Sequence, residues 1–400
     1  MRLAVVSPFV DRRHGTERAL AELLERLARN YQCEIHLYSQ GVADLSLDPS
    51  PAKFSPNISG IFWHRVPALP GPQLFQFLFW FYVNRLCRLA DRLFHRGSFD
   101  LVLSPGINCG DAQVIFVHAL FHRLREVLQQ ETGRVPERVS LVRRLHRRAY
   151  YGLLTRFEKS IYSNREVRLV AVSPRTAESI AKYFHRMDVA VIPNGVDTSQ
   201  FSPAARLAQR SEARARRRIR PDEFVLLLIG NDWANKGLPA ILEALSRLSD
   251  IPLKLLIVGT DVQEPFQEMA KRLNVLGQCL WEPATQDILE VYAAADLYVS
   301  PSREDSFGMP VAEAMACGLP AITSVFAGVA SLLHDNVDGF IFQDPLDFRS
   351  LAELIRKLFE EPELRNRVGQ AATKAAQEWT WDRNADSIWQ VLKKKIKTRP

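Results

Sequence analysis

The chain has 400 residues, of which 47% are hydrophobic and 24% are charged, and its formal net charge at pH 7 is +7. This length exceeds what one ordinary hydrophobic core supports, so we expect two domains, and the composition is that of a folded soluble protein. The longest apolar run, residues 74–83, is about half of a membrane span, so we expect no transmembrane helix.

Short apolar runs rich in β-branched residues alternate with helical patterns in the first half of the chain. The predicted strands are RLAVVS (2–7), EIHLYS (34–39), DLVLS (100–104), QVIFVH (113–118), RLVAVS (168–173) and VAVIPNG (189–195). Helical patterns near 16–30, 74–96, 137–163 and 174–185 separate most of these strands.

The alternation restarts after a basic stretch. Its predicted strands are FVLLLIG (224–230), LKLLIVG (253–259), QCLWEP (278–283), DLYVSPS (296–302), LPAITS (319–324) and GFIFQ (339–343), and helices at 347–360, 363–379 and 384–397 end the chain. Such alternation predicts parallel sheets covered by helices on both faces. We therefore expect an α/β protein with two doubly wound domains, a linker near 195–222, and a ligand site beyond the strand ends, in a cleft between the domains.

The positive charge is concentrated in two segments. Residues 123–168 hold twelve Lys and Arg against five Asp and Glu, and residues 206–220 hold seven against one. A polyanionic partner, either nucleic acid or an anionic membrane surface, is one interpretation. Solvated helix faces are the other, and we favour them for residues 206–220.

The cysteines and the first residues indicate a cytoplasmic protein. The five cysteines, at positions 33, 87, 109, 279 and 317, include no close pair at metal-ligand spacing, which suits reduced thiols. The opening MRLAVVSPFV reads as a strand and lacks a cleavage-like tail.

The stretch REDSFGMPVAEAMACGLPAI (303–322) follows a predicted strand and combines acidic residues with a glycine at a helix start. Pro310 suits the first helical turn and Gly318 suits the left-handed position that ends the helix. Gly308 allows the backbone to approach a ligand closely, and the free N–H groups at the helix start attract phosphate. Glu304 and Asp305 either bind a ligand or cap this helix, and the stretch alone leaves both interpretations open.

A second stretch, LLIGNDWANKGLPAILEAL (227–245), favours ligand binding. It places Lys236 and Gly237 at a helix start, where a cation costs stability unless an anion binds there. The first loop, DRRHGTERALAELL, similarly places Gly15 and Thr16 at a helix start in the other domain.

These motifs resemble those of the GT-B glycosyltransferases of family 4, which are retaining enzymes that use nucleotide-sugar donors. The family pattern sets two acidic residues eight positions apart around a Phe–Gly turn, as Asp305 and Glu313 are here. Further landmarks match in order, namely LVAVSPRTAESI, VIPNGVDTSQFSP, GNDWANKG, LLIVGTD and VYAAADLYVSPS. The resemblance covers nearly the whole chain and is more specific after residue 168.

The resemblance implies a GT-B fold with an acceptor-binding domain at 1–197, joined by a helix at 384–400, and a donor-binding domain at 198–383. It implies that Glu313 binds the donor ribose, that Asp305 acts at the sugar with Glu304 as a substitute, and that Lys236 holds the diphosphate. Further residues implied at the donor site are Gly15, Thr16, Asn231, Pro283, Thr285, Ser306, Phe307, Gly308 and Met309. His118 matches a histidine that members place near the donor sugar, although a histidine at a strand end is also commonly structural.

Three positions depart from the family pattern. The first acid is Asp305 rather than Glu, Asn231 stands where many members carry an arginine, and the first loop reads HGT where two glycines are common. Without the arginine and the second glycine, the diphosphate would have fewer cationic and backbone contacts than in most members of the family.

The implied activity is a retaining, metal-independent hexosyl transfer. The donor would be a UDP- or GDP-linked sugar used as co-substrate, without a separate cofactor. The sequence has no Asp-x-Asp on a strand-end loop, so we expect no metal ion, and Lys236 together with the helix start would stabilise the leaving diphosphate.

The implied acceptor is a saccharide or a lipid-linked saccharide of the cell envelope, lipopolysaccharide included. Aromatic residues at 70–96 and the basic residues at 123–168 suit contact with an anionic membrane, so we expect a cytoplasmic protein that attaches peripherally to the inner face of the plasma membrane. The other interpretation of the aromatic helix is that it belongs to the core. The alternatives to a transferase are a sugar-nucleotide epimerase or phosphorylase on the same fold, or a saccharide or nucleic-acid binder. A diphosphate cradle argues against the binder, so we expect no nucleic acid.

Overall fold

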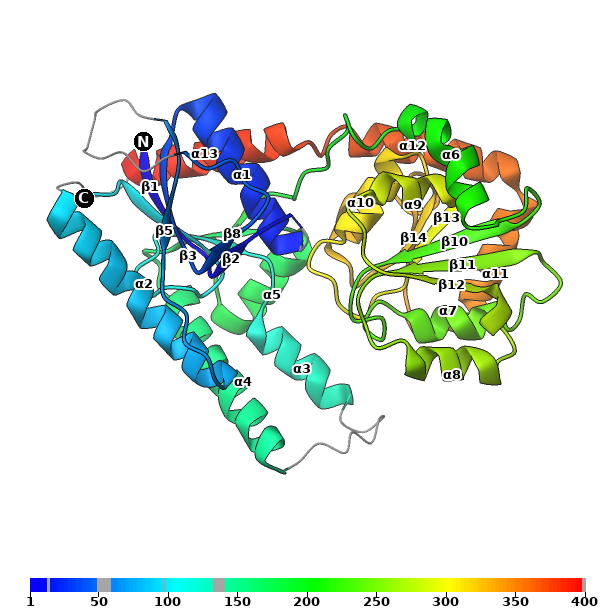
Figure 1. Cartoon of the computed structure of the whole chain (residues 1–400), viewed down its shortest axis with the longest axis horizontal. Coiled ribbons are helices and arrows are strands. Elements are labelled where there is room, and N and C mark those ends of the chain that lie inside the picture. Colours follow the sequence, from blue (N-terminus) through cyan, green and yellow to red (C-terminus); the bar gives the residue numbers. More distant parts are fainter. Residues whose placement is uncertain (13–14, 49–58, 96–97, 132–140, 398–400) are drawn as a thin grey trace. The chain divides into compact units, whose positions relative to one another are not determined.

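The structure is a computed structural model that describes residues 1–12, 15–48, 59–95, 98–131 and 141–397. The chain divides into two compact units, one formed by Met1–Pro193 with Trp381–Pro400 and the other by Asn194–Thr380. Each unit contains one main sheet, and both sheets appear in Figure 1. The expected fold class, two doubly wound parallel-sheet domains, is confirmed.

The first unit is built on a seven-stranded parallel sheet in the order β5-β3-β1-β6-β7-β8-β9. The strands are β1 (Arg2–Val6), β3 (Glu34–Ser39), β5 (Gly60–Arg65), β6 (Leu101–Pro105), β7 (Val114–Val117), β8 (Arg168–Ala171) and β9 (Ala190–Val191), with a separate pair β2 (Phe9–Val10) and β4 (Gly41–Val42). The helices are α1 (Gly15–Tyr31), α2 (Gln73–His95), α3 (Phe121–Glu131), α4 (Leu141–Tyr162), α5 (Pro174–Phe184) and α13 (Trp381–Lys397).

Helix α13 belongs to this first unit although it ends the described chain. It packs on α1, where Trp389 stacks on Tyr31 with ring centroids 4.7 Å apart. Arg26 Nε also donates to Asp382 Oδ1 at 2.7 Å. The C-terminal helix thus completes the covering of the N-terminal sheet.

The second unit is built on a six-stranded parallel sheet in the order β12-β11-β10-β13-β14-β15. The strands are β10 (Phe224–Ile229), β11 (Leu253–Val258), β12 (Cys279–Glu282), β13 (Leu297–Ser300), β14 (Ala321–Ser324) and β15 (Phe340–Phe342). The helices are α6 (Pro203–Arg216), α7 (Leu238–Leu245), α8 (Glu264–Arg272), α9 (Ile288–Ala294), α10 (Met309–Ala316), α11 (Phe348–Glu360) and α12 (Pro362–Ala376), with short 3-10 turns at Leu276–Gln278 and Gly328–Leu332. Figure 1 shows α9 and α10 on one side of this sheet and α7 and α8 on the other.

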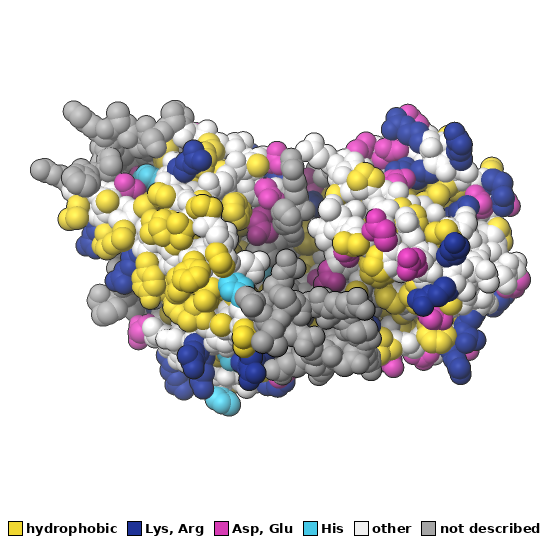
Figure 2. All heavy atoms as spheres, turned by 60° about the horizontal axis from the view of Figure 1, so that its bottom comes forward, with side chains coloured by type: hydrophobic (Ala, Val, Ile, Leu, Met, Phe, Trp, Pro, Cys, Tyr) yellow, Lys and Arg dark blue, Asp and Glu magenta, His cyan; other side chains and the backbone are white. Residues whose placement is uncertain are grey.

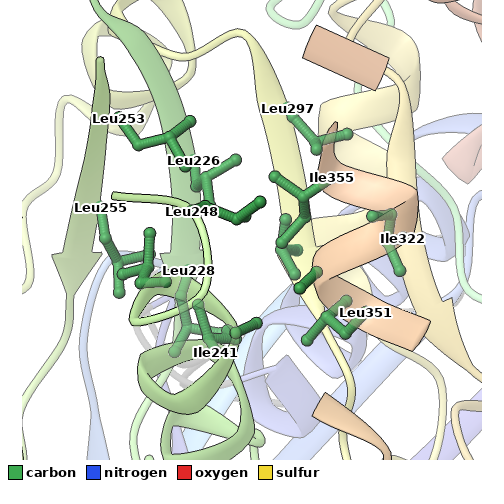
Figure 3. Packing of buried hydrophobic residues seen from close by; sticks show 14 of the residues in the cluster. Leu226, Leu228, Ile241, Leu248, Leu253, Leu255, Leu297, Ile322, Leu351 and Ile355 are labelled. Carbon is green, nitrogen blue, oxygen red and sulfur yellow. The ribbon is translucent and has the colours of Figure 1, made fainter. Parts of the chain in front are cut away.

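The core of the second unit lies between its sheet and the helices α7 and α11. Figure 3 shows Leu228 of β10 near Ile241 of α7, Leu226 of β10 near Leu248, and Leu351 and Ile355 of α11 near Ile322. These side chains are fully buried, and each contributes roughly 1.5–3 kcal/mol by leaving water. This packing holds the strand ends, and therefore the loops that follow them, in fixed positions.

The structure differs from the sequence-based expectations in several elements. Strand β5 and helix α3 were not predicted, and the expected linker at 195–222 contains α6, which packs on α9. The basic residues of this segment are also not simply a solvated face. Arg214 is buried, and its guanidinium donates to the backbone oxygens of Ala294, Arg220 and Glu223.

No helix in the described part of the chain is long and apolar enough to cross a membrane. The five cysteines, all of which lie among the described residues, are free.

Candidate active site in the second unit

The candidate site lies where the strand order of the second sheet reverses. From β10 the chain builds the sheet outward on one side through β11 and β12. It then returns to the other side of β10 with β13, β14 and β15. In doubly wound sheets, ligands bind beyond the carboxyl ends of the strands at such a switch point. The loops after β10 (230–237) and after β13 (301–308) meet there.

The loop after β10 is tied to the loop after β11. Asn231 Oδ1 accepts from the N–H of Thr260 at 2.7 Å, and Asp261 Oδ2 accepts from the N–H of Trp233 at 2.7 Å. The indole of Trp233 is fully buried against the rings of Trp281 and Phe266. The packing of Trp233 against these rings therefore fixes the loop after β10 on the core of the second unit.

Gly237 brings the two loops into backbone contact. Its φ of 86° lies in the left-handed region, and a Cβ there would stand 2.4 Å from the carbonyl oxygen of Pro301. Only glycine fits both constraints. Lys236, the preceding residue, is consequently held beside the loop after β13.

Lys236 and Asp305 form the central contact of the site. Lys236 Nζ lies 2.5 Å from Asp305 Oδ2, and the two side chains are 17% and 16% exposed. Asp305 Oδ1 accepts from the N–H of Phe307 at 3.2 Å. The two residues are 69 positions apart in the sequence, and the switch point brings them together.

The backbone after Asp305 is fixed from the other side by residues 326–329. Asp305 donates its N–H to Phe326 O at 3.1 Å, and Val329 donates to Phe307 O at 2.6 Å. Gly308, with φ 93°, is the N-cap of α10 and has no side chain with which to cap it. Neither Glu304 nor Asp305 is therefore the N-cap of α10, while Pro310 in the first turn and Gly318 after the helix end are confirmed.

Glu313 lies on α10 and is 3% exposed. Tyr292 of α9 donates its hydroxyl to Glu313 Oε2 at 2.7 Å and approaches Pro310 O at 3.2 Å. Burial, followed by the neighbouring Glu313 charge, raises the pKa of Tyr292 well above its usual value. Tyr292 therefore remains a neutral donor that orients the Glu313 carboxylate.

Two family models match the chain. "Glycosyltransferase Family 4" matches residues 13–200 and "Glycosyl transferases group 1" matches residues 209–375. Among curated relatives, a D-inositol 3-phosphate glycosyltransferase of Thermomonospora curvata is 30% identical over 244 residues, which are 56% of this chain and 56% of that protein. The chain thus spans about half the length of the curated relatives it matches.

Solved structures resemble the chain over nearly its full length. WaaG, described as a glycosyltransferase involved in lipopolysaccharide biosynthesis, has a TM-score of 0.77 at 19% identity and covers 98% of this chain and 99% of its own. HepE of Anabaena, solved with UDP and glucose, has a TM-score of 0.69 at 17% identity and covers 98% and 100%. At these identities the likeness shows the fold, which is GT-B. The chain thus carries a family 4 glycosyltransferase segment and a group 1 glycosyl transferase segment, on a GT-B fold.

In this GT-B chain the residues predicted for the donor site divide between the two units. The second unit brings together Lys236, Asp305 and the backbone of Phe307–Met309, with Glu313 on the helix that follows. Glu304 and Ser306 flank Asp305 in the same loop, and Asn231 lies on the loop after β10. Pro283 and Thr285 are exposed directly after β12.

The remaining predicted residues belong to the first unit of this GT-B chain. Gly15 and Thr16 are the first two residues of α1, and His118 directly follows β7 and is half-buried. Arg12, which comes before α1 in the chain, contacts Glu22 and Glu25 of that helix through its guanidinium.

Sequence reasoning missed three residues that support the site, namely Asp261, Tyr292 and Asn235. Asn235 directly precedes Lys236 in the Asn–Lys–Gly turn, and this position in the sequence could have indicated that it belongs to the site. The described residues contain no group of three or more His, Cys, Asp and Glu that could hold a metal ion.

Proposed function

We propose that this chain is a retaining glycosyltransferase that moves a hexosyl group from a UDP- or GDP-linked sugar to a saccharide or lipid-linked acceptor in cell-envelope polysaccharide or lipopolysaccharide biosynthesis. The observation that carries the proposal is the Lys236–Asp305 contact at the switch point, within a chain of this family. In this contact the Lys236 ammonium would be available to the diphosphate of the donor, and the Asp305 carboxylate would accept hydrogen bonds from the hydroxyls of its sugar.

The second unit offers a group for each part of the donor. Lys236 would hold the diphosphate, helped by the positive end of α10, and Glu313 would accept from the ribose hydroxyls. The exposed residues Pro283 and Thr285 would lie near the base. HepE, a structure with UDP bound, supports a nucleotide in this fold.

Transfer would depend mainly on positioning and electrostatics. As the sugar–phosphate bond breaks, negative charge develops on the diphosphate, and Lys236 and the α10 N–H groups would stabilise it. Asp305 would orient the sugar through its hydroxyls, and His118 stays a candidate for the donor sugar on the family resemblance alone. This division of roles needs no metal ion, and we assign no enzymic nucleophile at the anomeric carbon.

For the acceptor side, we propose peripheral attachment to an anionic membrane through the first unit. Phe75, Tyr82, Leu86, Leu89 and Leu93 of α2 are exposed, and their spacing of three, four or seven residues sets them on one face of the helix. Figure 2 shows hydrophobic side chains gathered on this unit with Lys and Arg around them. The core interpretation of α2 holds only for its other face, where Trp80, Asn84 and Arg88 are buried.

The proposed function is tested by thermal shift followed by transfer. UDP, GDP and their hexose conjugates are screened first, since a bound donor stabilises the folded state by mass action. Conjugates that raise the melting temperature are then incubated with lipid-linked and free saccharides. A glycosyltransferase releases nucleotide only when the acceptor is present. Release that requires free phosphate would identify a phosphorylase, and interconversion of the donor sugar without an acceptor would identify an epimerase. Either result would contradict the proposal.

A further inference from the structure

Asn235 links the two loops of the candidate site through three hydrogen bonds. Its side-chain Nδ2 donates to the carbonyl oxygen of Glu304 at 2.8 Å, and its Oδ1 accepts from the N–H of Glu304 at 3.1 Å. Its own carbonyl oxygen accepts from the N–H of Arg303 at 2.8 Å. A single side chain thus pairs with both polar groups of one backbone residue.

The position of these bonds matters because of their neighbours. Asn235 directly precedes Lys236, and Glu304 directly precedes Asp305. The link between Asn235 and Glu304 therefore sets the separation of the residues that form the Lys236–Asp305 contact. All three bonds end on the backbone at 303–304, so they position this loop whatever side chains it carries.

We propose that Asn235 is a positioning residue that holds Lys236 and Asp305 in register for the diphosphate and the sugar of the donor, an inference that rests on the proposed function. Asn235 touches neither substrate group itself. It acts by preventing the loop after β13 from moving away from the loop after β10.

The chemistry of the link requires a planar amide of this length. The amide carries a donor and an acceptor side by side, and these match the C=O and N–H of Glu304. Aspartate at this position would set a carboxylate oxygen against the Glu304 carbonyl oxygen, and alanine would remove both bonds. Both changes keep the loop length and leave Gly237, Lys236 and Asp305 in the chain.

The test compares Asn235→Ala and Asn235→Asp with the wild-type protein in two measurements. The first is the affinity for UDP and for uridine, with GDP and guanosine replacing them if the wild-type protein binds GDP instead. The second is hydrogen–deuterium exchange of the segment 303–308. Ile355→Val, a change in the core of the same unit, serves as a control that lowers stability without touching the loops.

We expect both Asn235 variants to lose about tenfold in affinity for the diphosphate, the effect of roughly one net hydrogen bond, because the loop at 303–308 would no longer hold the start of α10 beside Lys236. The nucleoside affinity should stay unchanged. The segment 303–308 should exchange faster, with strands β10 and β13 still protected. Ile355→Val should lower the melting temperature about as much as the Asn235 variants do. It should change neither the diphosphate affinity nor the exchange of the segment 303–308.

Unchanged UDP affinity in Asn235→Ala would overturn the inference. Equal losses for UDP and uridine would also overturn it, since they would reveal general destabilisation. A wild-type protein that binds no nucleoside diphosphate would overturn the proposed function and this inference together, and that result is distinct because it precedes any substitution.

Discussion

Lys236 has an internal counter-ion when no donor is present. Its ammonium pairs with the Asp305 carboxylate in a largely enclosed position, where the attraction between opposite charges exceeds that of an exposed pair. A diphosphate would compete with Asp305 for this ammonium. On binding, Lys236 would turn to the phosphate and Asp305 would be released to accept from the sugar. The same pair would therefore stabilise the empty site and prepare the occupied one.

Replacing Asp305 with asparagine separates these two roles. We expect Asp305→Asn to raise UDP affinity a few-fold, because Lys236 loses its competing partner, and to reduce transfer by about 100-fold or more, because the sugar loses a charged acceptor. Titration calorimetry and the transfer assay measure the two effects. Glu304→Gln is measured beside it. Full transfer by Asp305→Asn with an inactive Glu304→Gln would show that Glu304 is the functional acid.

The Tyr292–Glu313 pair gives a second prediction at this scale. Glu313→Ala should weaken nucleotide binding by about 1.5–3 kcal/mol, the loss of charge-assisted hydrogen bonds to the ribose. Tyr292→Phe keeps the ring and removes only the hydroxyl on Glu313 Oε2, so it should weaken binding by about 0.5–1.5 kcal/mol. Tyr162→Phe removes a buried hydroxyl in the core of the first unit and is the control. Nucleotide binding unchanged in Glu313→Ala would refute the ribose assignment.

The sequence could identify the residues that carry charge at this site but not those that position them. Lys236, Asp305 and Glu313 stand beside glycines at strand ends, and that local pattern predicts a ligand loop. Asn235 acts on a backbone 69 positions away, and Tyr292 acts from another helix. Neither contact corresponds to a recognisable spacing in the sequence, because both depend on which strands become neighbours in the sheet.

At the scale of elements, α6 shows why a basic segment need not face a polyanion or water. Three of its arginines, Arg206, Arg210 and Arg214, donate to the C-terminal end of α9, where backbone oxygens lack helical partners. Arg210 and Arg214 donate to the carbonyl oxygens of Ala293, Ala294 and Ala295, and both contact Asp296. Composition alone could not distinguish this arrangement from a solvated face, since the acceptors are mostly backbone oxygens.

Helix α6 therefore contributes stability through specific arginines. Arg214→Met should lower the unfolding free energy of the second unit by about 2–4 kcal/mol, because the buried oxygens of Ala294 and Glu223 lose this donor. Arg216→Met on the same helix removes an exposed charge and should change it by less than about 0.5 kcal/mol. Urea denaturation followed by tryptophan fluorescence compares the two. Equal effects would mean that the buried contacts do not stabilise this unit.

For the whole molecule, the strand–helix alternation was sufficient to predict two parallel sheets, because each buried strand leaves a continuous apolar run. It could not predict which apolar residues stay exposed. Helix α2 reads as apolar nearly all round, yet Tyr82 is 58% and Leu93 is 77% exposed. Only packing decides this, since Phe77 and Phe81 of α2 fill the contact with Phe157 of α4.

The exposed face of α2 and the charge of α4 lead to the last prediction, that the protein binds anionic vesicles and not neutral ones. Arg147 and Arg148 of α4 are exposed, whereas the side chains of Arg143 and Arg144 lie outside the described residues. Each basic residue at a membrane surface contributes about 1 kcal/mol at most, so binding should weaken as salt shortens the Debye length from about 8 Å to about 3 Å.

Two pairs of substitutions separate the contributions of charge and apolar contact. Vesicle sedimentation should show weaker binding for Arg147→Gln with Arg148→Gln, and a larger loss for Leu86→Ser with Leu93→Ser, whose side chains would enter the lipid interface. Arg216→Gln with Arg218→Gln removes the same charge from exposed positions of the second unit and should leave binding unchanged. UDP affinity should be equal in all three, because the donor groups assigned to UDP lie on other elements. If no vesicle binds the wild-type protein, the arginines of α4 are a solvated face, and a water-soluble acceptor becomes the better hypothesis.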